Sequence, residues 1–126
     1  MRELNMQIKK QITFLPANDL QSTTHFYIEI IGLQIFLDQG DCVIFRTCDN
    51  AYIGFCEREF SKFDGRIILT FIVDNVDEIY ENMLSHVDIV VSSPTINQKY
   101  QIYHFFVTDP NGYLVEIQKF LNLSDW

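Results

Sequence analysis

The feature that most constrains this chain is an internal repeat, in which a strand, a helix and three short strands follow one another twice. The first helix is preceded by Pro16-Ala17-Asn18-Asp19-Leu20, and the second by the aligned segment Ile72-Val73-Asp74-Asn75-Val76. Each segment ends an apolar stretch and offers a short polar side chain as a helix N-cap. Each half is too short to bury a large core by itself, so we expect the halves to pack against each other or against a second chain.

Apolar periodicity and turn residues predict the elements of both repeats. In the first repeat we expect a strand at 12–15, a helix from 20 to 31 ended by Gly32, and strands at 33–37, 42–47 and 52–56. In the second we expect a strand at 67–73, a helix at 76–84, strands at 88–91, 103–108 and 113–120, and a polar loop at 95–101. The sequence therefore predicts one α+β domain over residues 1–126, with module one at about 8–57, a linker at 58–65 and module two at about 66–120. A ferredoxin-like α+β domain is the alternative.

Composition narrows the classes of partner and the compartment. The net charge of −8 disfavours nucleic acid and anionic membranes, which would repel the chain. No apolar run approaches the roughly 20 residues of a membrane helix, and the polar start of the chain resembles no export signal, so we expect a cytoplasmic protein. The three cysteines, Cys42, Cys48 and Cys56, show no CxxC spacing and are expected to be reduced thiols.

Three segments resemble the glyoxalase/bleomycin-resistance/dioxygenase group, also called the vicinal oxygen chelate superfamily. They are the stretch from Phe14 to Leu33 with its His25-Phe26-Tyr27 and Ile31-Gly32-Leu33, the strand and cap from Thr70 to Asp77, and the closing hairpin Phe106–Ile117 around Asp109-Pro110-Asn111-Gly112. The resemblance implies two βαβββ modules whose sheets form a half-open barrel around a ligand cavity. In metal-dependent members, strands of both modules supply His, Glu or Gln to a divalent ion.

Carrying the family's four ligand positions onto this chain leaves the metal site incomplete. Alignment on the helix caps places them at Ile12, Gly54, Ile68 and Glu116, and only Glu116 has a donor atom. Shifting the register by one residue either way adds at most one ligand. Zinc and manganese sites normally need three or four protein ligands, so we expect no metal and no other cofactor.

Glu116 is the one candidate catalytic residue, as a proton acceptor or as a partner for a cationic ligand. A structural alternative is that it is a polar residue of a wet cavity, bonded to water or to a hydroxyl. If the last hairpin turns at Pro110-Asn111, then Phe105 pairs with Glu116 and His104 points to the helix side. A bulge in the turn would reverse the direction of His104.

Strand alternation predicts the face that would line the cavity. Its expected ligand-binding residues are Ile12, Phe14, Tyr52, Ile68, Thr70, Tyr103, Phe105 and Glu116. Apolar walls with few polar groups suit a small organic molecule that is apolar, aromatic or cationic. The sequence thus favours a metal-free homodimer that binds such a molecule. The alternatives are a lyase, isomerase or dioxygenase-like enzyme of the same superfamily, or a protein-association domain without a ligand.

Overall fold

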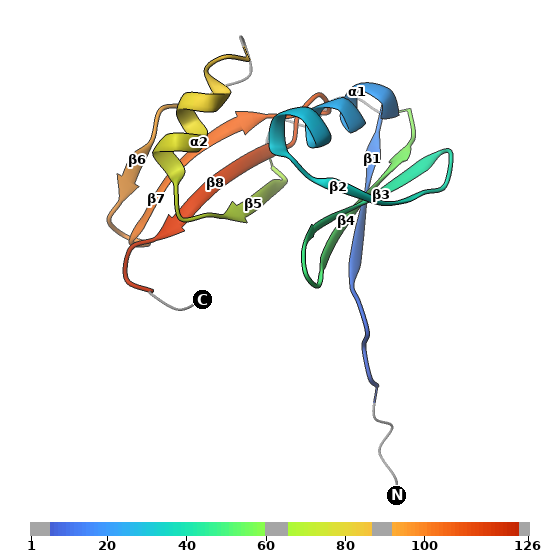
Figure 1. Ribbon diagram of the computed structural model, residues 1–126, viewed down its shortest axis with the longest axis horizontal. Coiled ribbons are helices and arrows are strands. Elements are labelled where there is room, and N and C mark those ends of the chain that lie inside the picture. The colour runs from blue at the N-terminus through green and yellow to red at the C-terminus, as the bar shows by residue number, and fades with distance from the viewer. Residues whose placement is uncertain (1–5, 60–65, 87–91, 124–126) are drawn as a thin grey trace, which may run out of the picture. The chain divides into compact units, whose positions relative to one another are not determined.

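The computed structural model describes residues 6–59, 66–86 and 92–123. The chain divides into two compact units, Met1–Phe60 and Ser61–Trp126. Each unit contains one four-stranded sheet with both parallel and antiparallel strand pairs, together with one helical segment (Figure 1). The repeated α+β order predicted from the sequence is therefore confirmed.

The first unit is built from one strand, one helical segment and a three-stranded meander. Its elements are β1 (Ile12–Ala17), α1 (Leu20–His25), η1 (Phe26–Ile31), β2 (Gln34–Asp38), β3 (Cys42–Cys48) and β4 (Ala51–Glu57). The strand order is β1-β4-β3-β2, with β1 parallel to β4 and the other pairs antiparallel. The helical segment provides the crossover that a parallel pair needs.

The helix of the first unit begins and ends where the sequence predicts, but its second half is wider than expected. A side-chain oxygen of Asp19 accepts a hydrogen bond from the Gln21 N–H at 3.1 Å, as an N-cap does. From Phe26 the segment is a π-helix, and the Gly32 N–H donates to the Tyr27 carbonyl five residues earlier at 3.0 Å. Gly32 ends it with φ of +91°, a conformation that glycine adopts without a side-chain clash.

Aromatic side chains form the core of the first unit. Tyr27, Phe45 and Phe55 are fully buried. The Tyr27 ring stacks on Phe55 with centroids 4.7 Å apart, and it lies 6.0 Å from Phe45. This cluster joins the helical segment to the central strands β3 and β4, so one face of the sheet is covered and the opposite face is left for other contacts.

The second unit repeats this plan. Its elements are β5 (Ile68–Ile72), α2 (Val76–Met83), β6 (Thr95–Asn97), β7 (Ile102–Thr108) and β8 (Leu114–Phe120), in the sheet order β5-β8-β7-β6. The predicted loop at 95–101 is wrong in part, because Thr95–Asn97 pairs with β7 as the edge strand. Three residues are too few for periodicity to reveal a strand. The strand expected at 88–91 lies outside the described residues.

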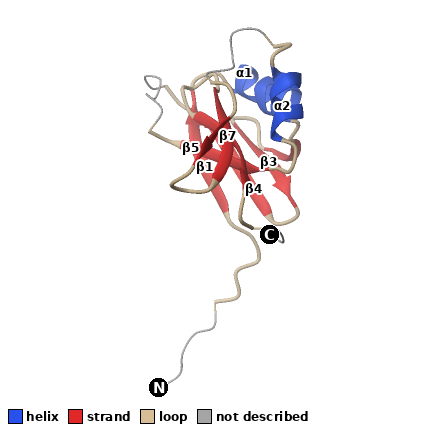
Figure 2. Ribbon diagram, turned by 90° about the vertical axis from the view of Figure 1, so that its left-hand side faces the viewer, coloured by secondary structure: helices blue, strands red, loops and turns tan. Residues whose placement is uncertain are grey.

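Helix α2 packs against β7 and β8 and covers one face of the second sheet (Figure 1). Figure 2 distinguishes the helices, in blue, from the strands, in red. Tyr80 from α2 contacts the fully buried Phe105 ring edge-to-face at 5.3 Å between centroids. Val107 and Val115, also fully buried, lie on the same face of the sheet as Phe105.

In the described part of the chain, no helix has the length and apolar character needed to cross a membrane.

The hairpin between β7 and β8 is closed by a five-residue turn around Asp109. One oxygen of the Asp109 carboxylate accepts from the backbone N–H groups of Asn111, at 2.8 Å, and Tyr113, at 2.9 Å. The Asp109 N–H donates to the Tyr113 carbonyl at 2.9 Å. Burial, and then the nearby Asp109 charge, raises the pKa of Tyr113 to about 12, so this residue stays neutral in the turn.

The expectation of three reduced cysteines is wrong for this structure. Cys42 on β3 and Cys56 on β4 face each other directly and form a disulfide, and Cys48 is a free, exposed thiol. The two cysteines are 14 residues apart in the sequence, so spacing alone does not show that they meet. The antiparallel register of β3 and β4 brings them together.

Replacing Phe105 by alanine is expected to lower the free energy of unfolding by about 3–5 kcal/mol, because the change leaves a cavity beneath α2. The measurement is urea unfolding followed by circular dichroism. Phe14→Ala is the control of the same residue type, since Phe14 is 47% exposed. Equal losses for the two variants would contradict the assigned core.

Alkylation of the native protein with iodoacetamide is expected to label Cys48 alone. Cys42 and Cys56 are expected to react only after a reductant has opened their disulfide. Intact-mass spectrometry, followed by peptide mapping, counts and locates the labels. Labelling of all three residues in protein prepared without reductant would show that the disulfide does not form.

Candidate functional site

The candidate site lies on the face of the second sheet that α2 does not cover. Strand pairing directs alternate side chains of β8, namely Leu114, Glu116 and Gln118, toward this face, which we call the open face of the second unit. Their direct partners on the neighbouring strands point the same way. These partners are Ile68, Thr70 and Ile72 from β5, and His104, Phe106 and Thr108 from β7.

Glu116 is the centre of a hydrogen-bonded cluster on the open face. Only 7% of its surface is exposed. The Thr70 hydroxyl donates to Glu116 Oε1 at 2.7 Å, and His104 Nδ1 lies 2.6 Å from Glu116 Oε2. Each carboxylate oxygen therefore has a protein partner, as a buried charged group requires.

The position of His104 corrects the prediction that it faces the helix side. Phe106, and not Phe105, pairs with Glu116, and His104 pairs with Gln118. The prediction assumed a tight turn at Pro110-Asn111, whereas the Asp109 turn holds five residues between Thr108 and Leu114. Because side chains alternate along a strand, this difference of one residue in register moves every β7 side chain to the other face.

Tyr103 and Phe105 consequently lie on the helix side, away from Glu116. The Tyr103 hydroxyl donates to the Asp77 carboxylate on α2, and this hydrogen bond raises the pKa of Tyr103. Phe105 is fully buried beneath Tyr80. The expectation that these two side chains share a face with Glu116 is wrong, whereas Ile68 and Thr70 do share it.

The contact with Glu116 also determines how the His104 ring presents its second nitrogen. A carboxylate only accepts hydrogen bonds, so the contact assigns the Nδ1 proton to a neutral His104 ring, and Nε2 then carries the lone pair. The ring also contacts Phe106 edge-to-face, with centroids 5.2 Å apart. The arrangement can thus accept a hydrogen bond, or a proton, at Nε2.

The first unit has a corresponding open face that carries the predicted residues Ile12, Phe14 and Tyr52. All three share a face with Gly54. A Cβ at Gly54 would lie 2.5 Å from the Phe14 ring, so the ring occupies the space that a side chain would need there. Tyr52 is mostly buried, in contact with the Phe36 ring and beneath the Lys10 ammonium group. The part of this face around Gly54 is therefore aromatic, and the basic residues Lys10 and Arg46 lie near Tyr52.

The residues at the four family metal positions do not fit a divalent ion. Ile12, Gly54 and Ile68 have no donor atom in their side chains. Glu116 has two oxygens, but both already accept hydrogen bonds from Thr70 and His104. Within residues 6–59, 66–86 and 92–123, no three side chains of His, Cys, Asp or Glu are grouped to hold a metal.

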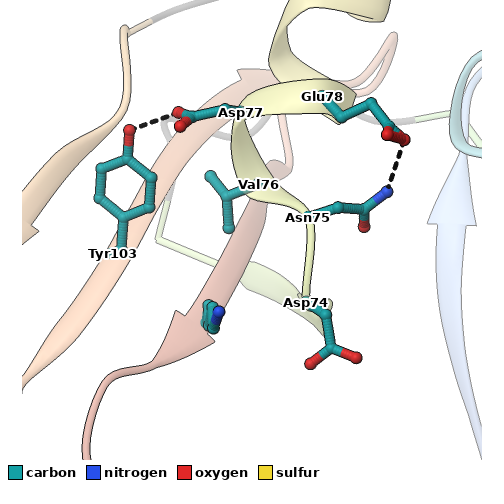
Figure 3. A pocket seen from close by; sticks show the side chains of 7 residues that line it. Asp74, Asn75, Val76, Asp77, Glu78 and Tyr103 are labelled. Atoms are coloured by element: carbon teal, nitrogen blue, oxygen red, sulfur yellow. Dashed lines mark hydrogen bonds between the residues drawn. The ribbon is translucent and has the colours of Figure 1, made fainter.

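A pocket of about 310 Å³ lies at the start of α2, on the helix side of the second unit (Figure 3). Its lining contains three carboxylates among seven residues, which are Asp74, Asn75, Val76, Asp77, Glu78, Tyr103 and Lys119. The Tyr103 hydroxyl donates a hydrogen bond to the Asp77 carboxylate, and the Asn75 side-chain amide donates one to Glu78, as the dashed lines in the figure show. Carboxylates in the first turn also stabilise a helix through its dipole, so these contacts have a structural explanation.

Gln118 lies on the open face, where alternation along β8 places it with Glu116, but it is not among the residues predicted to bind a ligand. It lies directly opposite His104 and is 8% exposed. Its alternation with Glu116 along β8 was the available signal. Buried glutamine is uncommon, and its polar amide needs a partner that sequence alone does not identify.

Comparison with known proteins agrees with this architecture. The solved structure of a glyoxalase/bleomycin resistance protein/dioxygenase from Nocardioides has a TM-score of 0.78 and 12% identity, covering 98% of this chain and 89% of that one. A lactoylglutathione lyase from Agrobacterium tumefaciens has a TM-score of 0.69 and 24% identity, with 86% and 90% covered. A possible glyoxalase from Bacillus cereus has a TM-score of 0.70 and 19% identity, and the match covers 90% of this chain and 98% of that one.

The sequence comparisons give the family directly. No curated protein matches the chain. The family model of the Glyoxalase/Bleomycin resistance protein/Dioxygenase superfamily matches residues 9–117, which is most of the chain and includes both repeats. The chain therefore belongs to the glyoxalase/bleomycin resistance protein/dioxygenase superfamily.

Proposed function

We propose that this chain binds a small organic molecule on the open face of the second unit, without a metal ion at the four family positions. The observation that carries the proposal is the Glu116 cluster. Buried polar side chains stand there on a face that also carries Ile68, Ile72 and Phe106. Apolar surface with a few oriented polar groups is the usual composition of a site for a small molecule.

The polar groups of this face would orient the ligand, and the apolar groups would supply most of the affinity. Ile68 and Ile72 are 49% and 38% exposed, so apolar surface is available for burial. Burying it releases roughly 25 cal/mol for each Å² removed from water. An apolar or aromatic molecule fits this surface, and the Glu116 carboxylate would also favour a cationic group on it.

An enzymatic role of lyase or isomerase type is the second candidate, and the His104–Glu116 contact favours it. A histidine whose Nδ1 is held by a carboxylate can accept a proton at Nε2. One of the similar structures is of a lactoylglutathione lyase, but at 24% identity that likeness supports the fold alone. Turnover that persists in a chelator and disappears in His104→Gln would favour this candidate over binding alone.

A thermal-shift screen against aromatic and cationic compounds tests the binding proposal. A ligand at a hundredfold excess over its Kd is expected to stabilise the fold by about 2.7 kcal/mol, because it binds only the folded state. The stabilisation should be lost in Glu116→Gln and retained in Glu29→Gln, which removes the same charge from an exposed position of η1. It should not change on addition of EDTA.

Two results of the same screen would count against the proposal. Stabilisation by Zn²⁺, Mn²⁺ or Ni²⁺ that EDTA reverses would show that the chain completes a metal site. Equal stabilisation of the wild type and Glu116→Gln by every active compound would place binding elsewhere on the molecule.

We also propose that the protein is a homodimer. Exposed apolar side chains support this, since Phe14 of the first unit and Ile68 of the second are each about half exposed. Twofold pairing is the commonest way for a chain to cover such surface. Light scattering coupled to size-exclusion chromatography is expected to give the mass of two chains. A single-chain mass at micromolar concentration would refute dimer formation.

A further inference from the structure

Two polar groups on the open face of the second unit have no hydrogen-bond partner in the described part of the chain. They are the Nε2 atom of His104, whose Nδ1 contacts Glu116, and the side-chain amide of Gln118. By contrast, Thr70 and both oxygens of Glu116 are paired. The open face thus contains a completed cluster beside two groups that could still form hydrogen bonds.

Both unpaired groups belong to largely buried residues but can be reached from outside. Gln118 is 8% exposed, and the His104 side chain is 13% exposed. No buried side-chain nitrogen or oxygen among the described residues lacks a partner, so these unpaired atoms must be accessible. An accessible amide on a largely buried residue can bond to water or to a ligand, but it loses free energy if a ligand covers it without offering a partner.

Strand pairing places the two groups next to each other. His104 on β7 and Gln118 on β8 are direct partners in the antiparallel pair, and such partners have Cβ atoms about 4.5–5.5 Å apart. Ile72 is the partner of Gln118 on the other side, and the Phe106 ring contacts His104. A ligand on these groups would therefore meet apolar surface around a polar pair.

The chemistry of the two groups is complementary to one class of ligand. When the His104 ring is neutral and carries its proton on Nδ1, facing Glu116, Nε2 accepts a hydrogen bond, and the Gln118 amide can donate one. We propose that His104 and Gln118 together bind a planar lactam or cyclic imide, whose N–H donates to Nε2 while its C=O accepts from the amide. This inference rests on the proposed function and specifies the ligand class of that site.

Anionic ligands and purely apolar ligands fit this polar pair less well than a lactam or imide. The Glu116 carboxylate contacts the His104 ring directly and would repel a carboxylate or phosphate placed beside it. A purely apolar ligand would remove His104 Nε2 and the Gln118 amide from water without satisfying either, which is unfavourable. A flat neutral molecule with adjacent donor and acceptor avoids both penalties, and an aromatic ring fused to it would cover Ile72 and Phe106.

Isothermal titration calorimetry with three matched probes tests the inference: 2-quinolone, N-methyl-2-quinolone and quinoline. The second probe lacks the N–H donor, and the third lacks both the donor and the carbonyl. 2-Quinolone is expected to bind about five- to tenfold more tightly than N-methyl-2-quinolone, the effect of one net hydrogen bond, and by a larger factor than quinoline, which can form neither of the two. Because the ligand is changed and the protein is not, a folding defect cannot produce this difference.

Protein variants then locate the two hydrogen bonds. Gln118→Met keeps the length of the side chain but removes the amide, and should weaken 2-quinolone about five- to tenfold while leaving quinoline unchanged. Gln21→Met, the same change at an exposed position of α1, is the matched control and should change neither affinity. In ¹H–¹⁵N spectra, 2-quinolone should shift the Gln118 side-chain amide resonances and the His104 ring nitrogens.

The outcomes separate this inference from the proposed function. Equal affinities for the three probes would overturn the lactam or imide assignment, although binding of organic molecules at the site would stand. No binding of 2-quinolone would also overturn it, whereas stabilisation by other compounds that depends on Glu116 would keep the proposed function. If no compound acts through Glu116, both proposals fail.

Discussion

The hydrogen bonds of the Asp109 turn are the constraint on which the candidate site depends. One carboxylate oxygen holds two backbone N–H groups and keeps five residues between β7 and β8. That length determines the register of the hairpin, and the register determines which side chains share a face. With one residue fewer, Phe105 would lie opposite Glu116 and His104 would lie under α2.

The same register gives Glu116 a different environment from that of a metal ligand. Thr70 and His104 satisfy its two oxygens, and the other three family positions hold Ile12, Gly54 and Ile68. A buried carboxylate must have partners, and here the protein itself provides them. The superfamily fold is present, and Glu116 is the centre of a side-chain cluster; beside it, His104 Nε2 and the Gln118 amide have no hydrogen-bond partner among the described residues.

Much of the fold could be predicted because it depends on local signals. Asp19 and Gly32 mark the ends of the first helical segment, and alternation placed Ile68, Thr70 and Glu116 on one face. The errors arose where a contact between distant residues decides the outcome. The β6 strand is recognisable only by its pairing with β7, and the Cys42–Cys56 disulfide only by the register of β3 and β4.

The sequence by itself determined the repeated strand–helix–three-strand order, the superfamily resemblance and the lack of donor atoms at three of the four metal positions. These follow from residue type and from periods of a few residues, which the chain carries locally. Only the tertiary structure decided that His104, and not Phe105, shares a face with Glu116, and that His104 pairs with Gln118. The physical reason is that a side chain's face depends on the hydrogen-bond register between strands, and a single turn residue can change that register.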